Sequence, residues 1–209
     1  MRPIRAAARG GTGLRSDFTR SARRLGLASA AGVVVLGVAY LACLIAGLAA
    51  LASPQDPIAD PWFTALELLI LVMMPFMVTL MVAIHAWSTR EDKVWSRAAV
   101  LFMALVAVIT STVHFAILTL SREDAFRDMG WLFSFSWPSV AYALDILAWD
   151  LFFPLSVLFA APVFRGGRLE NWIRILLRIS GVLALAGLTG VFMNCLLYTS
   201  DAADEEDSV

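Results

Sequence analysis

Long unbroken runs of apolar residues divide the chain into five segments, separated by short polar stretches. Each run is close to the roughly 20 residues with which a helix crosses a hydrocarbon core. None of the runs alternates apolar and polar positions, so the pattern favours helices over half-buried strands. A helix also satisfies its backbone hydrogen bonds within its own segment, as lipid requires. The predicted helices span about residues 25–52, 62–87, 98–120, 138–164 and 175–194.

The fold class that follows is all-α, a polytopic transmembrane helix bundle. Composition agrees with it, because 60% of the residues are hydrophobic and only 16% are charged. Soluble domains are typically about 45–50% apolar and about 25% charged. The two Cys cannot define a disulfide framework, and we find no phosphate loop, dinucleotide fingerprint or metal-ligand motif. We therefore expect no cofactor, no metal and no nucleic-acid partner; the predicted partner is the lipid bilayer.

Basic residues gather on alternate polar segments. Segments 1–24, 88–97 and 165–178 carry 7, 3 and 4 of them, whereas 53–61 and 121–137 carry 0 and 2. An excess of Lys and Arg marks cytoplasmic loops, so we predict a cytoplasmic N-terminus and a basic cytoplasmic arm over residues 1–24. Fifteen of the sixteen basic residues are Arg, which is typical of a GC-rich bacterial genome and indicates a bacterial inner (cytoplasmic) membrane. The residues that we expect to set this topology are Arg23, Arg24, Arg90, Lys93, Arg97, Arg165 and Arg168.

The C-terminal residues stand apart from the rest. Residues 195–205 read CLLYTSDAADE, which resembles one reading frame of the transposase adapter used to prepare sequencing libraries. We interpret residues 195–209 as adapter read-through rather than native protein, so the native C-terminus is truncated. The bundle proper then covers residues 25–194, and we expect six spanning helices in the intact protein.

Prolines and small residues distinguish three of the predicted helices. Pro75 and Pro154 lie inside the second and fourth, where a missing backbone N–H predicts a kink. In the first helix, Ala39, Cys43 and Gly47 recur every four residues. Such a stripe of small side chains lets another helix approach closely.

Four ionisable residues inside the predicted helices are candidates for a functional site, because charged groups are costly within a bilayer. At about 1.5 Å per residue, Asp150 lies almost at the midplane, with Asp145 and His114 about 7–9 Å outward and Glu67 near the outer interface. Pro154 cannot donate to the carbonyl of Asp150. We predict a polar pocket in the outer half of the bundle, lined by Asp150, Asp145 and His114, with Glu67 at its mouth. In the alternative interpretation, these carboxyls are structural partners between helices.

Two function classes fit this pattern. A transporter-like protein would use the carboxylate site for protons or cations; a non-catalytic component, such as a sensor, assembly factor or scaffold, would use the same groups for packing. An intramembrane enzyme is the third alternative and requires His114 to meet the carboxyls within hydrogen-bond distance. We expect no catalytic residues, and we assign no role to His85, near the cytoplasmic end of the second helix.

Overall fold

The computed structural model describes residues 18–54 and 56–206, and the side chains as far as residue 190. Within these residues the chain is helical and has no strand. Five helical segments are long and apolar enough to cross a membrane. The predicted all-α helical bundle is therefore confirmed.

The described elements are helices and helical turns throughout. They are α1 (Arg20–Ala49), α2 (Trp62–Trp87), α3 (Lys93–Thr119), the 3-10 turns η1 (Leu120–Arg122) and η2 (Asp124–Phe126), α4 (Gly130–Phe133), α5 (Val140–Ile146), the π-helical turn η3 (Leu147–Phe152), α6 (Phe153–Ala160), the 3-10 turn η4 (Ala161–Val163) and α7 (Arg168–Glu206). The run from α5 to η4 forms the fourth spanning segment.

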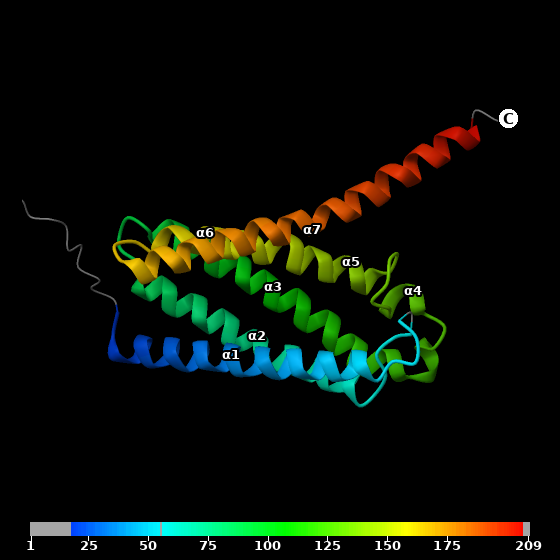
Figure 1. Ribbon diagram of the computed structural model, residues 1–209, viewed down its shortest axis with the longest axis horizontal. Helices are drawn as coiled ribbons and strands as arrows, with labels where there is room; N and C mark the ends of the chain where they lie inside the picture. Colours follow the sequence, from blue (N-terminus) through cyan, green and yellow to red (C-terminus); the bar gives the residue numbers. More distant parts are fainter. Residues whose placement is uncertain (1–17, 55, 207–209) are drawn as a thin grey trace, which may run out of the picture.

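The five segments lie side by side in chain order (Figure 1). α1 packs on α2, α2 on α3, α3 on the fourth segment, and the fourth segment on α7. Successive segments run in opposite directions, so the molecule has two ends. We call the end with Arg20 and the turns at 88–92 and 164–167 the basic end, and the end with the connections 50–61 and 120–139 the opposite end.

Three helices begin earlier than the sequence predicted, and one of them is α3, which starts at Lys93 rather than near 98. α1 starts at Arg20 because the Thr19 hydroxyl caps it, accepting a hydrogen bond from the Ala22 N–H at 3.1 Å. Arg23 and Arg24 therefore belong to the first turns of α1 and not to an arm; residues 1–17 lie outside the described part of the chain. α7 starts at Arg168 rather than near 175, since Gly166 adopts a φ of 107° that reverses the chain just before it.

The two prolines have different effects on the backbone. Around Pro154 the fourth segment is a π-helical turn, in which the Phe153 N–H bonds to the carbonyl of Ala148, five residues back. The missing N–H of Pro154 explains why α-helical bonding is interrupted here. Pro75, in contrast, lies inside a continuous α2. Its carbonyl accepts a hydrogen bond from the Thr79 hydroxyl at 2.8 Å.

Small residues allow α1 to approach α2 closely. A Cβ atom at Gly32 would lie 2.5 Å from the ring of Phe76, and one at Gly47 would lie 2.8 Å from Ile58. Cys43 is buried, and its thiol donates to the carbonyl of Trp62 at 3.6 Å. Cys43 and Gly47 of the predicted stripe thus pack against the start of α2 and the connection before it.

Candidate intramembrane polar site

Three ionisable side chains lie at one depth in the bundle. Glu67 is five positions after the start of α2, His114 five before the end of α3, and Asp145 five after the start of α5. All three of these helix termini belong to the opposite end, so each residue lies about 7.5 Å along its helix from that end. Antiparallel packing of neighbouring helices therefore brings three residues that are far apart in the sequence to the same level.

His114 lies between the two carboxylates, and we call the three residues the triad. Its Nδ1 is 2.8 Å from Oε2 of Glu67, a hydrogen bond buried on both sides. Its Nε2 is 3.5 Å from Oδ1 of Asp145. Glu67 and His114 are 3% and 5% exposed, whereas the side chain of Asp145 is 24% exposed. Asp145 is thus the accessible carboxylate of the triad.

The two contacts of the imidazole differ in kind. The 3.5 Å separation between His114 and Asp145 is an ion-pair distance, but the atoms are not aligned as a hydrogen bond. His114 Nε2 and Asp145 Oδ1 are consequently buried without a hydrogen-bond partner among the described residues. The two atoms face each other as an ion pair, and no other described polar atom bonds to either of them.

Protonation of His114 changes the number of N–H donors and the net charge of the triad. A neutral imidazole carries one N–H, whereas the protonated ring carries an N–H on both nitrogens and faces a carboxylate with each. The triad has a net charge of −1 with a protonated ring and −2 with a neutral one, when both carboxyls are ionised. The arrangement can therefore hold or release one proton between two fixed acids.

The triad lies in the wall of a partly open cavity of about 930 Å³. Its wall is formed by residues of α1, of the connection before α2, of α2 and α3, of the 133–136 segment and of the fourth spanning segment. The ring of Phe135 is 5.3 Å from that of His114. The lining residues are Tyr40, Leu44, Pro57, Ile58, Phe63, Leu66, Glu67, Ile70, Met73, His114, Phe133, Ser134, Phe135, Ser136, Asp145 and Trp149.

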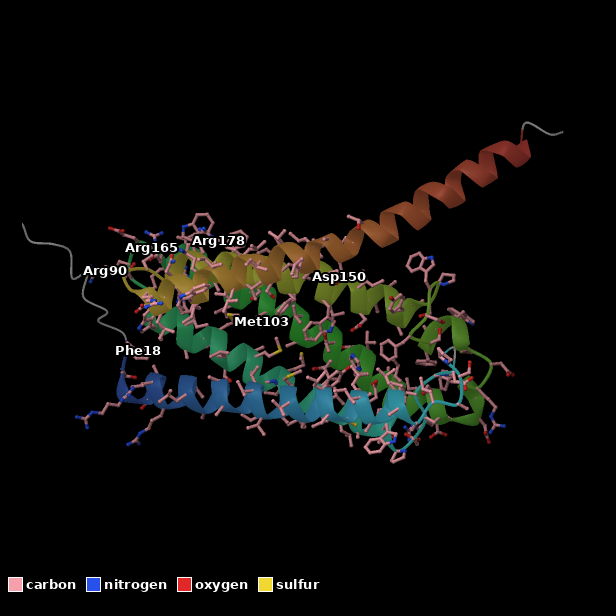
Figure 2. The ribbon with its side chains drawn as sticks, viewed as in Figure 1. Phe18, Arg90, Met103, Asp150, Arg165 and Arg178 are labelled. Atoms are coloured by element: carbon pink, nitrogen blue, oxygen red, sulfur yellow. The ribbon has the colours of Figure 1, made fainter. Side chains whose placement is uncertain are left out.

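Asp150 is placed apart from the other three predicted residues. It is not among the residues that line the cavity. Its carboxyl group lies against the backbone of α7, where a Cβ atom at Gly187 would be 3.0 Å from its Cγ and Oδ1 (Figure 2 labels Asp150). Five residues separate Asp145 from Asp150, which is about 140° around a helix, so the two carboxyls point to different neighbours.

Glu67 also differs from its predicted position. We expected it at the mouth of the pocket, but it is one of the least exposed groups in the cavity wall. The reason is its pairing with His114 on the neighbouring helix, which draws its carboxyl into the interface between α2 and α3. Thr110 of α3 is fully buried, and its hydroxyl has no hydrogen-bond partner in the described chain.

A polar network at the basic end was missed by sequence reasoning. His85 Nδ1 is 2.8 Å from the hydroxyl of Ser96, which is also 2.9 Å from that of Ser88. Nearby, Arg165 forms an ion pair with the buried Asp92 at 2.9 Å and ties the 164–167 turn to the 88–92 turn. The available signal was the spacing of His85, in the last turn of α2, and Ser88, the residue that caps its end. Figure 2 shows Arg90 and Arg165 at this same end.

An intramembrane enzyme would require His114 to meet the carboxyls within hydrogen-bond distance, and the structure meets this requirement only in part. His114 does converge with a carboxyl at hydrogen-bond distance, but its hydrogen bonds among the described residues go to Glu67 alone. Both ring nitrogens face carboxylates, and neither faces a hydroxyl or thiol nucleophile as nucleophilic catalysis needs. Within the described chain, no group of three His, Cys, Asp or Glu residues is arranged to hold a metal ion.

Comparisons with protein-family models, with curated proteins and with solved structures find no match to this chain. The function is therefore argued from the geometry of the cavity and of the triad.

Proposed function

We propose that this protein is transporter-like, and that it binds a small solute in the cavity and couples binding to protonation of the triad. The observation that carries the proposal is the ion pair between His114 and the partly exposed Asp145 in the wall of a cavity of about 930 Å³. A ligand cavity typically has apolar walls and a few convergent polar groups, as here.

The non-catalytic alternative explains one contact of the triad but not the other. The hydrogen bond between Glu67 and His114 joins α2 to α3, as a structural pair would. A purely structural role predicts that the contact between the second nitrogen of His114 and Asp145 is as deeply buried as the contact with Glu67. The partly exposed Asp145 beside that nitrogen supports a binding role instead.

The proposal includes an orientation in a bacterial cytoplasmic membrane. The basic end carries Arg20, Arg23 and Arg24 in α1 together with the turns at 88–92 and 164–167. We place this end in the cytoplasm because positively charged loops are retained there. The cavity then lies in the outer half of the membrane, and a solute enters or leaves it on the outer side.

Irregular backbone near the cavity provides points at which α2 and the fourth spanning segment can bend. Trp149, in the π-helical turn η3, lines the cavity, and Pro154 follows that turn. Pro75 lies two residues after Met73, which lines the cavity from α2. π-helical turns and prolines are the usual sites at which helices bend. We propose that α2 and the fourth segment bend at these points to change access to the triad.

Proton-coupled transport can be tested in proteoliposomes that contain the dye pyranine, which reports internal pH. Small cationic, neutral and anionic solutes are added outside in turn, and a coupled solute is expected to change the internal pH. His114→Gln should abolish this response, while Arg127→Gln, at an exposed position, should leave it unchanged. Folding of each variant is checked by thermal unfolding followed by Trp fluorescence.

Two results would contradict the proposal. If folded wild-type protein gives no pH change with any solute class, the protein is not a coupled transporter. An unchanged response in folded His114→Gln would mean that the triad does not carry the proton.

A further inference from the structure

We infer that the cavity binds an organic cation with large hydrophobic groups. The inference deepens the proposed function, since it names the class of solute that the cavity takes. It rests on the charge of the lining residues, on the aromatic side chains among them and on the volume of the cavity.

The ionisable residues of the cavity favour a cationic solute. Two acids, Glu67 and Asp145, face one imidazole, and no Lys or Arg is among the lining residues of the described chain. The basic residue Arg122, at the same end, is instead paired with Asp60 at 3.3 Å and bonded to Thr64. A cation would compensate the negative charge of the triad, whereas an anion would be desolvated beside two carboxylates.

The apolar lining favours a large organic cation over a metal ion. Five aromatic side chains contribute to the wall, and the negative faces of such rings attract cations that have lost their water. A volume of about 930 Å³ is near the upper end of the roughly 300–1,000 Å³ found for small-molecule sites. A small hydrated ion would leave most of this apolar surface uncovered. The aromatic residues are Tyr40, Phe63, Phe133, Phe135 and Trp149.

Within the triad, the two carboxylates have different roles. Glu67 is buried and bonded to His114, so it positions the imidazole. Asp145 is the more exposed acid and lines the cavity, so it meets the solute cation. A cation beside Asp145 repels the proton on the neighbouring His114. Binding of the cation therefore releases a proton from the imidazole to solvent, and cation and proton compete.

The test compares two probes of the same shape and opposite charge. Binding of tetraphenylphosphonium and of tetraphenylborate to the full chain in lipid nanodiscs is measured by calorimetry, with empty nanodiscs as the blank. The phosphonium is expected to bind and the borate not to bind. Asp145→Asn should weaken phosphonium binding by about tenfold or more, as expected when a charged partner is lost. Asp128→Asn, the same change at an exposed site of the same end, should not.

Proton release is measured in the same experiment by repeating it in two buffers with different ionisation enthalpies. Wild type should release up to one proton per phosphonium bound, and His114→Gln should release none. The His114→Gln variant is accepted only if its thermal unfolding remains cooperative; Asp145→Asn provides a second, less buried test of the same site.

The outcomes separate this inference from the proposed function. Equal binding of both probes, or binding of the borate alone, overturns the cationic class but leaves a solute site. If neither probe binds while another solute changes the internal pH of proteoliposomes, the inference fails and the proposed function stands. If the phosphonium binds through Asp145 but no solute moves protons across the membrane, the inference stands and the transporter proposal fails.

Discussion

At the scale of single residues, the surroundings of an acid determine what it does. Asp145 lies beside the imidazole of His114 and lines a cavity. Asp150, only five residues further on, lies against the backbone of Gly187 in α7. Asp60, outside the spanning segments, is fixed by Thr64 and Arg122 at the opposite end. Three Asp side chains with the same chemistry thus serve three different purposes in this chain.

Asp60 gives a prediction about pH. Hydrogen bonds from Thr64 are the main cause that lowers the pKa of this carboxyl below its ordinary value of 3.8, and the charge of Arg122 adds to them. Because the pKa is lower in the folded chain, the stabilising contacts are fully present above the ordinary value and are lost as the pH falls through the lowered one. Carboxyl NMR of Asp60 during an acid titration should therefore show a midpoint below 3.8.

Two variants separate the causes of this shift. Thr64→Val removes the hydroxyl donor and should raise the midpoint of Asp60 more than Arg122→Gln does, because the hydroxyl hydrogen bond is the larger cause. A larger effect of Arg122→Gln would mean that charge, rather than the Thr64 hydroxyl, holds the carboxyl ionised.

At the scale of helices, glycines on one face allow close packing. A Cβ atom at Gly181 in α7 would lie 2.6 Å from Leu158 and 3.2 Å from Val157, both in α6. One at Gly190 would meet nothing within 4 Å. Van der Waals packing, rather than apolar burial, drives helices together in lipid, so a close backbone approach stabilises the pair.

Gly181 and Gly190 of α7 give a matched prediction. Gly181→Ala should destabilise the bundle by about 1–3 kcal/mol, the usual cost of forcing an extra carbon into a packed contact. Gly190→Ala should be neutral or stabilise it by up to about 1 kcal/mol, because Ala has the higher helix propensity. Unfolding of both variants in one detergent measures the difference. Equal stability of the two would contradict close packing of α7 on α6.

At the scale of the whole molecule, charge distinguishes the two ends of the bundle. The turns at the basic end are joined by the ion pair of Asp92 and Arg165, and Lys93 donates to the carbonyl of His85 there at 2.8 Å. At the opposite end, long connections and residues 133–136 adjoin the cavity. The structure therefore combines a compact, tied end with an end that carries the candidate site.

The proposed orientation predicts the effect of removing charge from one end. Neutralising Arg90, Lys93 and Arg97 together to Gln should produce a mixed topology, because the second cytoplasmic segment loses its basic residues. Reporter fusions in each connection report the side of the membrane. The same change of Arg122 and Arg127, at the opposite end, should leave the topology unaltered. Reporters unchanged in the triple variant would contradict our orientation.

The pattern of apolar runs determined the fold class and the number of spanning segments in the described chain. The predicted second helix, 62–87, has the bounds that the structure shows, because polar and proline-rich stretches flank it closely. The starts of α1, α3 and α7 were misplaced. The Thr19 cap before α1 and the turn at Gly166 before α7 are local features that hydrophobicity does not record. The interpretation of residues 195–209 as adapter read-through remains a prediction.

The candidate site was determined only in part by the sequence. Rise per residue placed Asp145 and His114 at nearly one depth, because depth along a straight helix follows from counting. Tertiary structure decided the rest. Which residues face each other depends on the rotation of every helix about its axis and on its neighbours, and that brought Glu67 to His114 and turned Asp150 toward α7. A cavity is a property of several packed helices together, so no single segment of sequence encodes it.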